Sequence, residues 1–107
     1  MRIVAANKIL LRSGETLVNH AIVLDSEQRV VGFTPLVSAT VERPFVEFFC
    51  GLITPAIPSF ADVSSMKSLQ EYPFEPLEIG YQGQLWLWTD VDLNTLIPFP
   101  NASYRVL

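Results

Sequence analysis

Apolar and polar side chains alternate along the first half of the chain, a pattern typical of half-buried β-strands. Strands are predicted over residues 2–6, 8–11, 21–25, 29–34 and 45–49. The polar residues 25–28 separate two of these strands and predict a tight turn, so that the strands on either side form a hairpin. The first half therefore has the pattern of β-structure with one hairpin.

Prolines and glycines divide the second half. Pro55 and Pro58 are incompatible with a helix interior or a central strand, so an irregular connection is expected there. Residues 62–69 predict one short helix, with Asp62 or Ser64 as its N-cap. Further strands are predicted over residues 77–81, 84–89 and 103–107. Because residues 84–89 are mostly apolar, this strand should be central and covered on both faces.

The predicted fold class is therefore all-β, a small β-sandwich or barrel-like domain of about eight short strands with one short helix. A chain of 107 residues corresponds to a single domain. Hydrophobic residues make up 50% of the chain and charged residues 17%, against a usual charged share of about 25%. This surplus of apolar side chains predicts self-association or a protein partner.

Charge and cysteine content exclude several classes of function. The net charge is −4 and no cluster of lysine and arginine exists, so neither nucleic acid nor an anionic membrane is an expected partner. No apolar run approaches the ~18 residues that a membrane-spanning helix needs. The single cysteine, Cys50, cannot form a disulfide within the chain, which favours a reducing compartment such as the cytoplasm.

The segment from Gly51 to Val63 carries the most specific pattern, Gly-Leu-Ile-Thr-Pro-Ala-Ile-Pro-Ser-Phe-Ala-Asp-Val. It resembles the segment through which enzymes of the amidohydrolase superfamily enter their catalytic barrel. In that family the segment leads into a His-x-His pair that holds a metal ion, and the corresponding positions here are Ala61 and Val63. Neither side chain can donate an electron pair to a metal. Pro58 stands where the first barrel strand would begin, and it lacks a backbone donor.

The resemblance extends toward both ends of the chain. Residues 3–33 and 47–55 resemble the strands before the barrel, and residues 77–88 resemble the return after it. The resemblance implies a composite β-domain, built from both ends of the chain, that has lost the barrel and its metal ligands. The implied division of this one domain is N-terminal strands over 1–55, an irregular connection with the short helix over 56–76, and C-terminal strands over 77–107.

Few side chains are candidates for catalysis or metal binding. His20 is the only histidine and is expected to be an exposed turn residue. Cys50 ends an apolar strand and is expected to be a buried small hydrophobe, because a reactive thiol needs a base or cation nearby. A solvated face is expected for the acidic residues of the second half, which are Glu71, Glu75, Glu78, Asp90 and Asp92. We predict no catalytic residue, no metal site, no cofactor and no enzymatic activity.

Trp86 and Trp88 lie two residues apart and should face the same side of their strand. Core packing is one role for them, and an aromatic surface once covered by the barrel is the other. The candidate interaction surface consists of Pro55, Ile57, Phe60, Phe74, Trp86 and Trp88. The leading hypothesis is a non-catalytic structural or protein-interaction module, self-associating or bound to a protein partner, that derives from a metal-dependent hydrolase. The alternatives are an accessory subunit that completes a separately encoded barrel, and a β-domain that binds a small ligand on its aromatic face.

Overall fold

The computed structural model describes residues 2–12, 14–36, 46–55, 68–69 and 75–107. Over these residues the fold is a single mixed sheet of seven strands, and none of them belongs to an α-helix. The all-β fold class is confirmed. The strands are β1 (Arg2–Arg12), β2 (Glu15–Leu17), β3 (His20–Leu24), β4 (Val30–Pro35), β5 (Val46–Thr54), β6 (Trp86–Val91) and β7 (Pro98–Val106).

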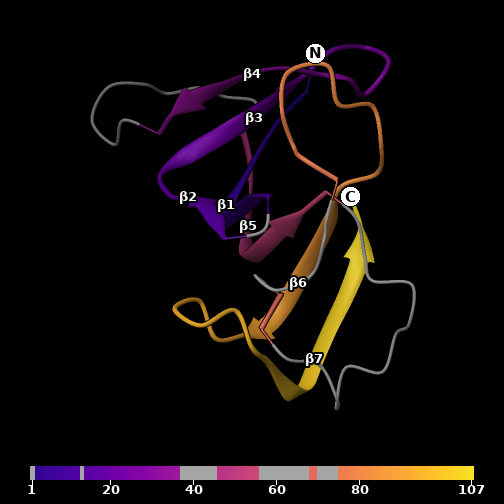
Figure 1. Ribbon diagram of the computed structural model, residues 1–107. Helices are drawn as coiled ribbons and strands as arrows, with labels where there is room; N and C mark the ends of the chain where they lie inside the picture. The colour runs from indigo at the N-terminus through magenta and orange to yellow at the C-terminus, as the bar shows by residue number, and fades with distance from the viewer. Residues whose placement is uncertain (1, 13, 37–45, 56–67, 70–74) are drawn as a thin grey trace.

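The strand order is β4-β3-β1-β5-β6-β7, and β2 pairs with the second half of β1. The pairing of β1 with β5 is parallel, and every other pairing in this sheet is antiparallel. Figure 1 shows β6 and β7 extending below the N-terminal strands, with β5 between the two groups. The pairing of β5 with β6 therefore joins segments from both ends of the chain into one sheet.

Several predicted strand boundaries were wrong. Residues 2–6 and 8–11 form one continuous strand, β1, because Asn7 and Lys8 stay in the extended chain. Residues 77–81 were predicted to be a strand, but they contain a turn at residues 79–80. The last strand begins at Pro98, five residues earlier than expected, because β7 lies at the sheet edge, where proline costs no ladder hydrogen bond.

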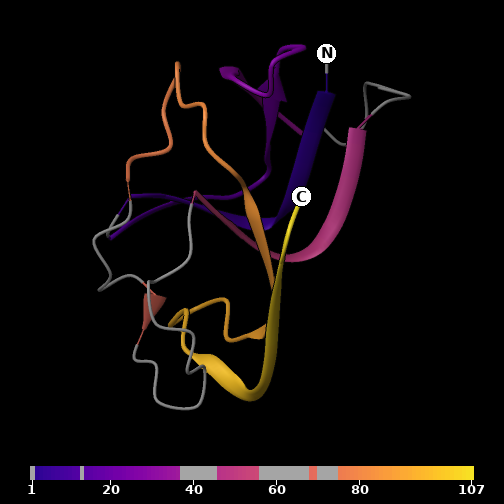
Figure 2. The ribbon, with the colours of Figure 1, turned by 90° about the vertical axis from the view of Figure 1, so that its right-hand side faces the viewer.

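A bulge bends the sheet where β1 and β5 meet. Ala6 pairs with Phe49 and Lys8 with Leu52, so Asn7 alone stands opposite two residues, Cys50 and Gly51. The side-chain Oδ1 of Asn7 accepts a hydrogen bond from the Gly51 N–H at 2.7 Å, which satisfies the donor that the bulge takes out of the ladder. Bulges of this kind bend a strand, and Figure 2 shows β5 curving along its length.

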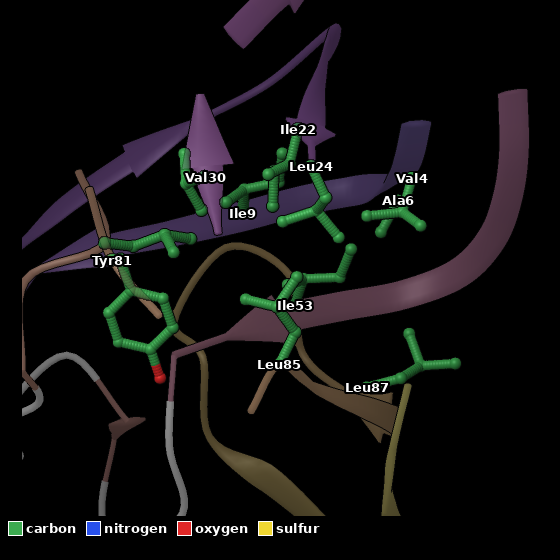
Figure 3. Close-up of a cluster of buried hydrophobic side chains, with 11 residues drawn as sticks. Val4, Ala6, Ile9, Ile22, Leu24, Val30, Ile53, Tyr81, Leu85 and Leu87 are labelled. Atoms are coloured by element: carbon green, nitrogen blue, oxygen red, sulfur yellow. The ribbon is translucent and has the colours of Figure 1, made fainter. Parts of the chain in front are cut away.

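The central strands bury side chains on both faces, because neighbouring residues of a strand point in opposite directions. On β1, β5 and β6, consecutive residues enter two separate apolar clusters: Ile9, Ile53 and Leu87 enter the first, and Leu10, Leu52 and Trp88 enter the second. Figure 3 shows the first cluster, which residues 77–85 help to close with Leu77, Tyr81 and Leu85. The expectation of a central strand covered on both faces is thus met by β6.

The helix expected over residues 62–69 lies, except for Ser68 and Leu69, outside the described residues. Among the residues that the structure does describe, Leu69 is fully buried and belongs to the second cluster. No helix in this described part is long and apolar enough to cross a membrane.

Candidate functional site

Trp88, predicted as part of an interaction surface, is fully buried in the second cluster. Its Nε1 donates a hydrogen bond to the buried Thr54 Oγ1 at 3.0 Å, and its ring lies 4.8 Å from that of Tyr104. The same Tyr104 ring meets the ring of the half-buried Trp86 edge-on at 5.9 Å. The two tryptophans therefore share one side of β6, as the sequence predicts, but Trp88 offers no surface to a partner. Its size and its satisfied N–H make it a core residue.

Pro55 is also buried, and its carbonyl oxygen accepts a hydrogen bond from the Tyr81 hydroxyl. Ile57, Phe60 and Phe74 lie outside the described residues. Of the six side chains predicted for the surface, the described part of the chain therefore leaves only Trp86 partly accessible.

His20 and Cys50 both differ from their predicted settings. His20 is the first residue of β3 rather than a turn residue, is half-buried, and its Nδ1 lies 2.8 Å from the Val18 carbonyl oxygen. Cys50 is exposed, not buried, because alternation along β5 puts it on the same side of the strand as the exposed Phe48. Within the described residues, no three or more His, Cys, Asp or Glu side chains come together as metal ligands would.

Glu75, Glu78 and Asp90 are exposed, as predicted, and several other acidic side chains hold turns or ion pairs. Asp92 Oδ1 accepts hydrogen bonds from the backbone N–H groups of Thr95 and Asn94, and these two bonds hold the pKa of Asp92 below its usual value. Asp25 does the same in the β3–β4 turn, where the N–H of Arg29 is the main cause of its lowered pKa. Such carboxylates, fixed by donors in their ionised form, stabilise local structure.

Strand pairing assembles an apolar surface that was not predicted. Val23, Ile3 and Val46 form one row across β3, β1 and β5, and the next row on the same face ends in Phe48. We call this surface the outer face. Its two rows consist of Gly32, Val23, Ile3 and Val46, and of Thr34, Ala21, Ala5 and Phe48.

None of the eight positions of the outer face carries a charged side chain. Phe48, at the β5 end of the second row, is 53% exposed. Ile3, Val23 and Val46 are half-buried, whereas Ala5 and Ala21 in the second row are fully buried, so Phe48 is the most accessible apolar side chain of the face. The face lies opposite the first cluster, since Val4 and Ile22, the neighbours of Ile3 and Val23, point into that cluster. An uncharged sheet face with an exposed aromatic side chain can bind another apolar surface.

The sequence indicates the apolar sides of the single strands, but it does not show how these sides combine into one face. Alternation separates the side of each strand that carries Ile3, Val23 or Phe48 from the opposite side of that strand. Whether those sides coincide depends on the parallel register between residues 3 and 46, which pairs segments more than forty residues apart. Comparison with family models, with curated proteins and with solved structures finds no match to this chain.

Proposed function

We propose that this chain is a non-catalytic protein-interaction module that uses the outer face as its contact surface. The partner that we propose for this surface is a second copy of the chain. The observation that carries this proposal is the exposure of Phe48 within eight uncharged positions of a regular sheet. A large apolar side chain at such a position gains free energy when a partner removes it from water.

The composition supports the same proposal. Half of the residues are hydrophobic and only 17% are charged, so there is a surplus of apolar surface to cover. Two copies that pack their outer faces together would form two stacked sheets, a common arrangement of β-structure. The single exposed Cys50 fits a reducing compartment, and a cytoplasmic location is part of the proposal.

We also propose descent from the composite domain of an amidohydrolase-like enzyme. The pairing of β5 with β6 supports this idea, because it brings residues 52–54 beside residues 86–88, on either side of the connection where that family carries its barrel. The residues at the metal-binding positions, Ala61 and Val63, support the absence of hydrolytic chemistry.

Sedimentation equilibrium of the purified chain tests the contact surface. We expect a mass above that of a single chain at high concentration, and Phe48→Ser should shift the equilibrium toward the monomer by at least about tenfold, since burying a phenylalanine contributes ~1.5–3 kcal/mol and both copies carry the substitution. Phe99→Ser is the matched control, because Phe99 is exposed to a similar degree (47%) but lies on β7, away from the outer face.

A single-chain mass at every concentration would rule out self-association. An equal effect of Phe48→Ser and Phe99→Ser would show that association does not use the outer face. Circular dichroism of both variants distinguishes these outcomes from unfolding.

A further inference from the structure

A hollow of about 330 Å³ lies on the opposite side of the sheet from the outer face, where the start of β1, the β3–β4 turn and the end of β7 meet residues 83–85. Its volume falls at the lower end of the range for small-molecule sites. The residues that line it are Arg2, Leu24, Gln28, Gly83, Gln84, Leu85, Val106 and Leu107.

Three of these residues supply polar groups. The Arg2 guanidinium donates from Nε and Nη2 to Glu47 at 2.7 and 3.4 Å, and from Nη1 to the Leu107 carbonyl oxygen at 3.4 Å. A guanidinium has five N–H donors, so two remain for a ligand. In the described part of the chain, the side-chain amides of Gln28 and Gln84 form no hydrogen bond, and each can donate and accept.

The remaining wall is apolar. Leu24 and Leu85 are almost fully buried and belong to the first cluster shown in Figure 3. Val106 also lines the hollow, but its side chain lies beside Trp86 on the other side of the sheet, so the two leucines supply the apolar wall. This combination of branched aliphatic walls with a few polar groups is typical of small-molecule sites.

The charges around the hollow select an uncharged ligand. Glu47 already neutralises Arg2 through a 2.7 Å ion pair. A carboxylate placed beside the free N–H donors of Arg2 would bring a second negative charge close to Glu47, which is unfavourable. An amide avoids this repulsion, because its carbonyl can accept from Arg2 while its N–H donates to a glutamine side chain.

We propose that this hollow binds a small uncharged molecule that carries an amide group next to a short branched aliphatic chain. The amide meets Arg2, Gln28 and Gln84, and the aliphatic chain packs against Leu24 and Leu85.

Titration of the full chain with N-acetyl-leucinamide, followed by the backbone amide signals in NMR, tests the proposal. A ligand of this size should bind with a Kd on the order of a few millimolar, with signal shifts at residues 24, 84, 85 and 106. Isovalerate offers a similar branched chain with a negative charge, and acetamide offers the amide without the chain. Each should bind at least ~fivefold more weakly than N-acetyl-leucinamide. Preferential binding of isovalerate, or no saturable shift with any probe, would overturn the proposal.

Substitution of Gln84, with Gln82 as the control, tests whether the ligand binds in the hollow. Gln84→Leu removes one hydrogen-bonding side chain from the hollow and should weaken binding about fivefold. Gln82→Leu is the matched control, because Gln82 is exposed in the same segment but does not line the hollow, and it should leave the Kd unchanged. Equal effects of the two substitutions would overturn the assignment. The result is independent of the contact surface proposed above, because Phe48→Ser changes the opposite face of the sheet.

Discussion

Gly51 is the residue whose identity the fold constrains most closely. Its φ of +138° lies where side chains other than glycine are strained, and a Cβ atom placed there would lie 2.1 Å from the Trp88 carbonyl oxygen. The bulge on β5 thus brings the backbones of β5 and β6 together at a point where no side chain fits. The hydrogen bond from the Gly51 N–H to Asn7 holds this approach in place.

We expect Gly51→Ala to lower the free energy of unfolding by more than ~2 kcal/mol, because backbone must move to relieve the contact. Urea denaturation measures this change. Gly32→Ala is the control, since nothing lies within 4 Å of a Cβ at Gly32 and its φ is ordinary; it should change stability by less than ~0.5 kcal/mol. Similar values for the two variants would contradict the role assigned to the bulge.

For single residues, the sequence predicted the local role of a polar side chain better than it predicted which side chains are buried. It suggested that Asp25 belongs to a turn, because turn residues act through bonds to their own neighbours. It assigned Cys50 to the interior because the strand is apolar, but Cys50 lies on the same side of β5 as the exposed Phe48. It also left Trp88 between core and surface. Tyr104 and Thr54, which decide the matter, lie at least sixteen residues away along the chain.

Among the elements, residues 77–85 show why a strand pattern did not produce a strand. Their backbone bonds go to different partners instead of one neighbouring strand: Leu77 N–H donates to the Leu11 carbonyl at 2.7 Å and Gly80 N–H to the Val30 carbonyl at 2.8 Å. At the end of the segment, the Leu85 carbonyl accepts a hydrogen bond from the Leu107 N–H at 2.8 Å. Alternation predicts an extended segment with one buried side, but the partner strands decide whether a ladder forms.

Tyr81 fixes this segment over the first cluster. Its hydroxyl lies within hydrogen-bonding distance of the Pro55 and Gln84 carbonyl oxygens, and Figure 3 shows it pointing away from the aliphatic side chains. Burial, with a smaller contribution from the negative charge of Glu75, raises the pKa of Tyr81 to about 12. The folded chain therefore holds this proton more tightly than the unfolded chain, whose tyrosine pKa is near ~10.

This difference predicts a loss of stability at alkaline pH. Below pH ~10 Tyr81 is neutral in both states, and between pH ~10 and ~12 only the unfolded state gives up the proton, so the free energy of unfolding falls. We expect the urea midpoint to fall more steeply over this range in the natural chain than in Tyr81→Phe. At pH 7, Tyr81→Phe should cost ~1 kcal/mol for the lost hydrogen bond. Parallel pH profiles of the two proteins would contradict the prediction.

Across the whole molecule, both edges of the sheet resist pairing with another strand. At the start of β4, the N–H and carbonyl groups of Val30 bond to Tyr81 and Gly80, and at its end Pro35 has no N–H to donate. On the other edge, β7 contains Pro98 and Pro100. Prolines and covered edges oppose edge-to-edge association, so the outer face is the better candidate for a contact with a second copy.

The sequence predicted the fold class because alternation and turn residues are local signals. The single sheet could not be predicted, since the parallel pairing of β1 with β5 and the joining of β5 to β6 depend on contacts between distant segments. The outer face and the hollow share this origin. Each combines residues from at least three elements, for example Val23, Ile3 and Phe48 for the face, and Arg2, Leu24 and Gln84 for the hollow.

The two apolar clusters share the strands β1, β5 and β6, and this sharing predicts that the sheet unfolds as one unit. Ile9 and Leu10 are neighbours on β1, both fully buried, and they enter opposite clusters. We expect Ile9→Ala and Leu10→Ala each to cost ~2–5 kcal/mol, and each to lower the whole unfolding transition. The tryptophan fluorescence, which reports largely on the second cluster through Trp88, and the far-ultraviolet circular dichroism should then coincide in both variants. If Ile9→Ala shifted the circular dichroism transition while the fluorescence transition stayed in place, the two clusters would be independent, and the shared strands would not couple them.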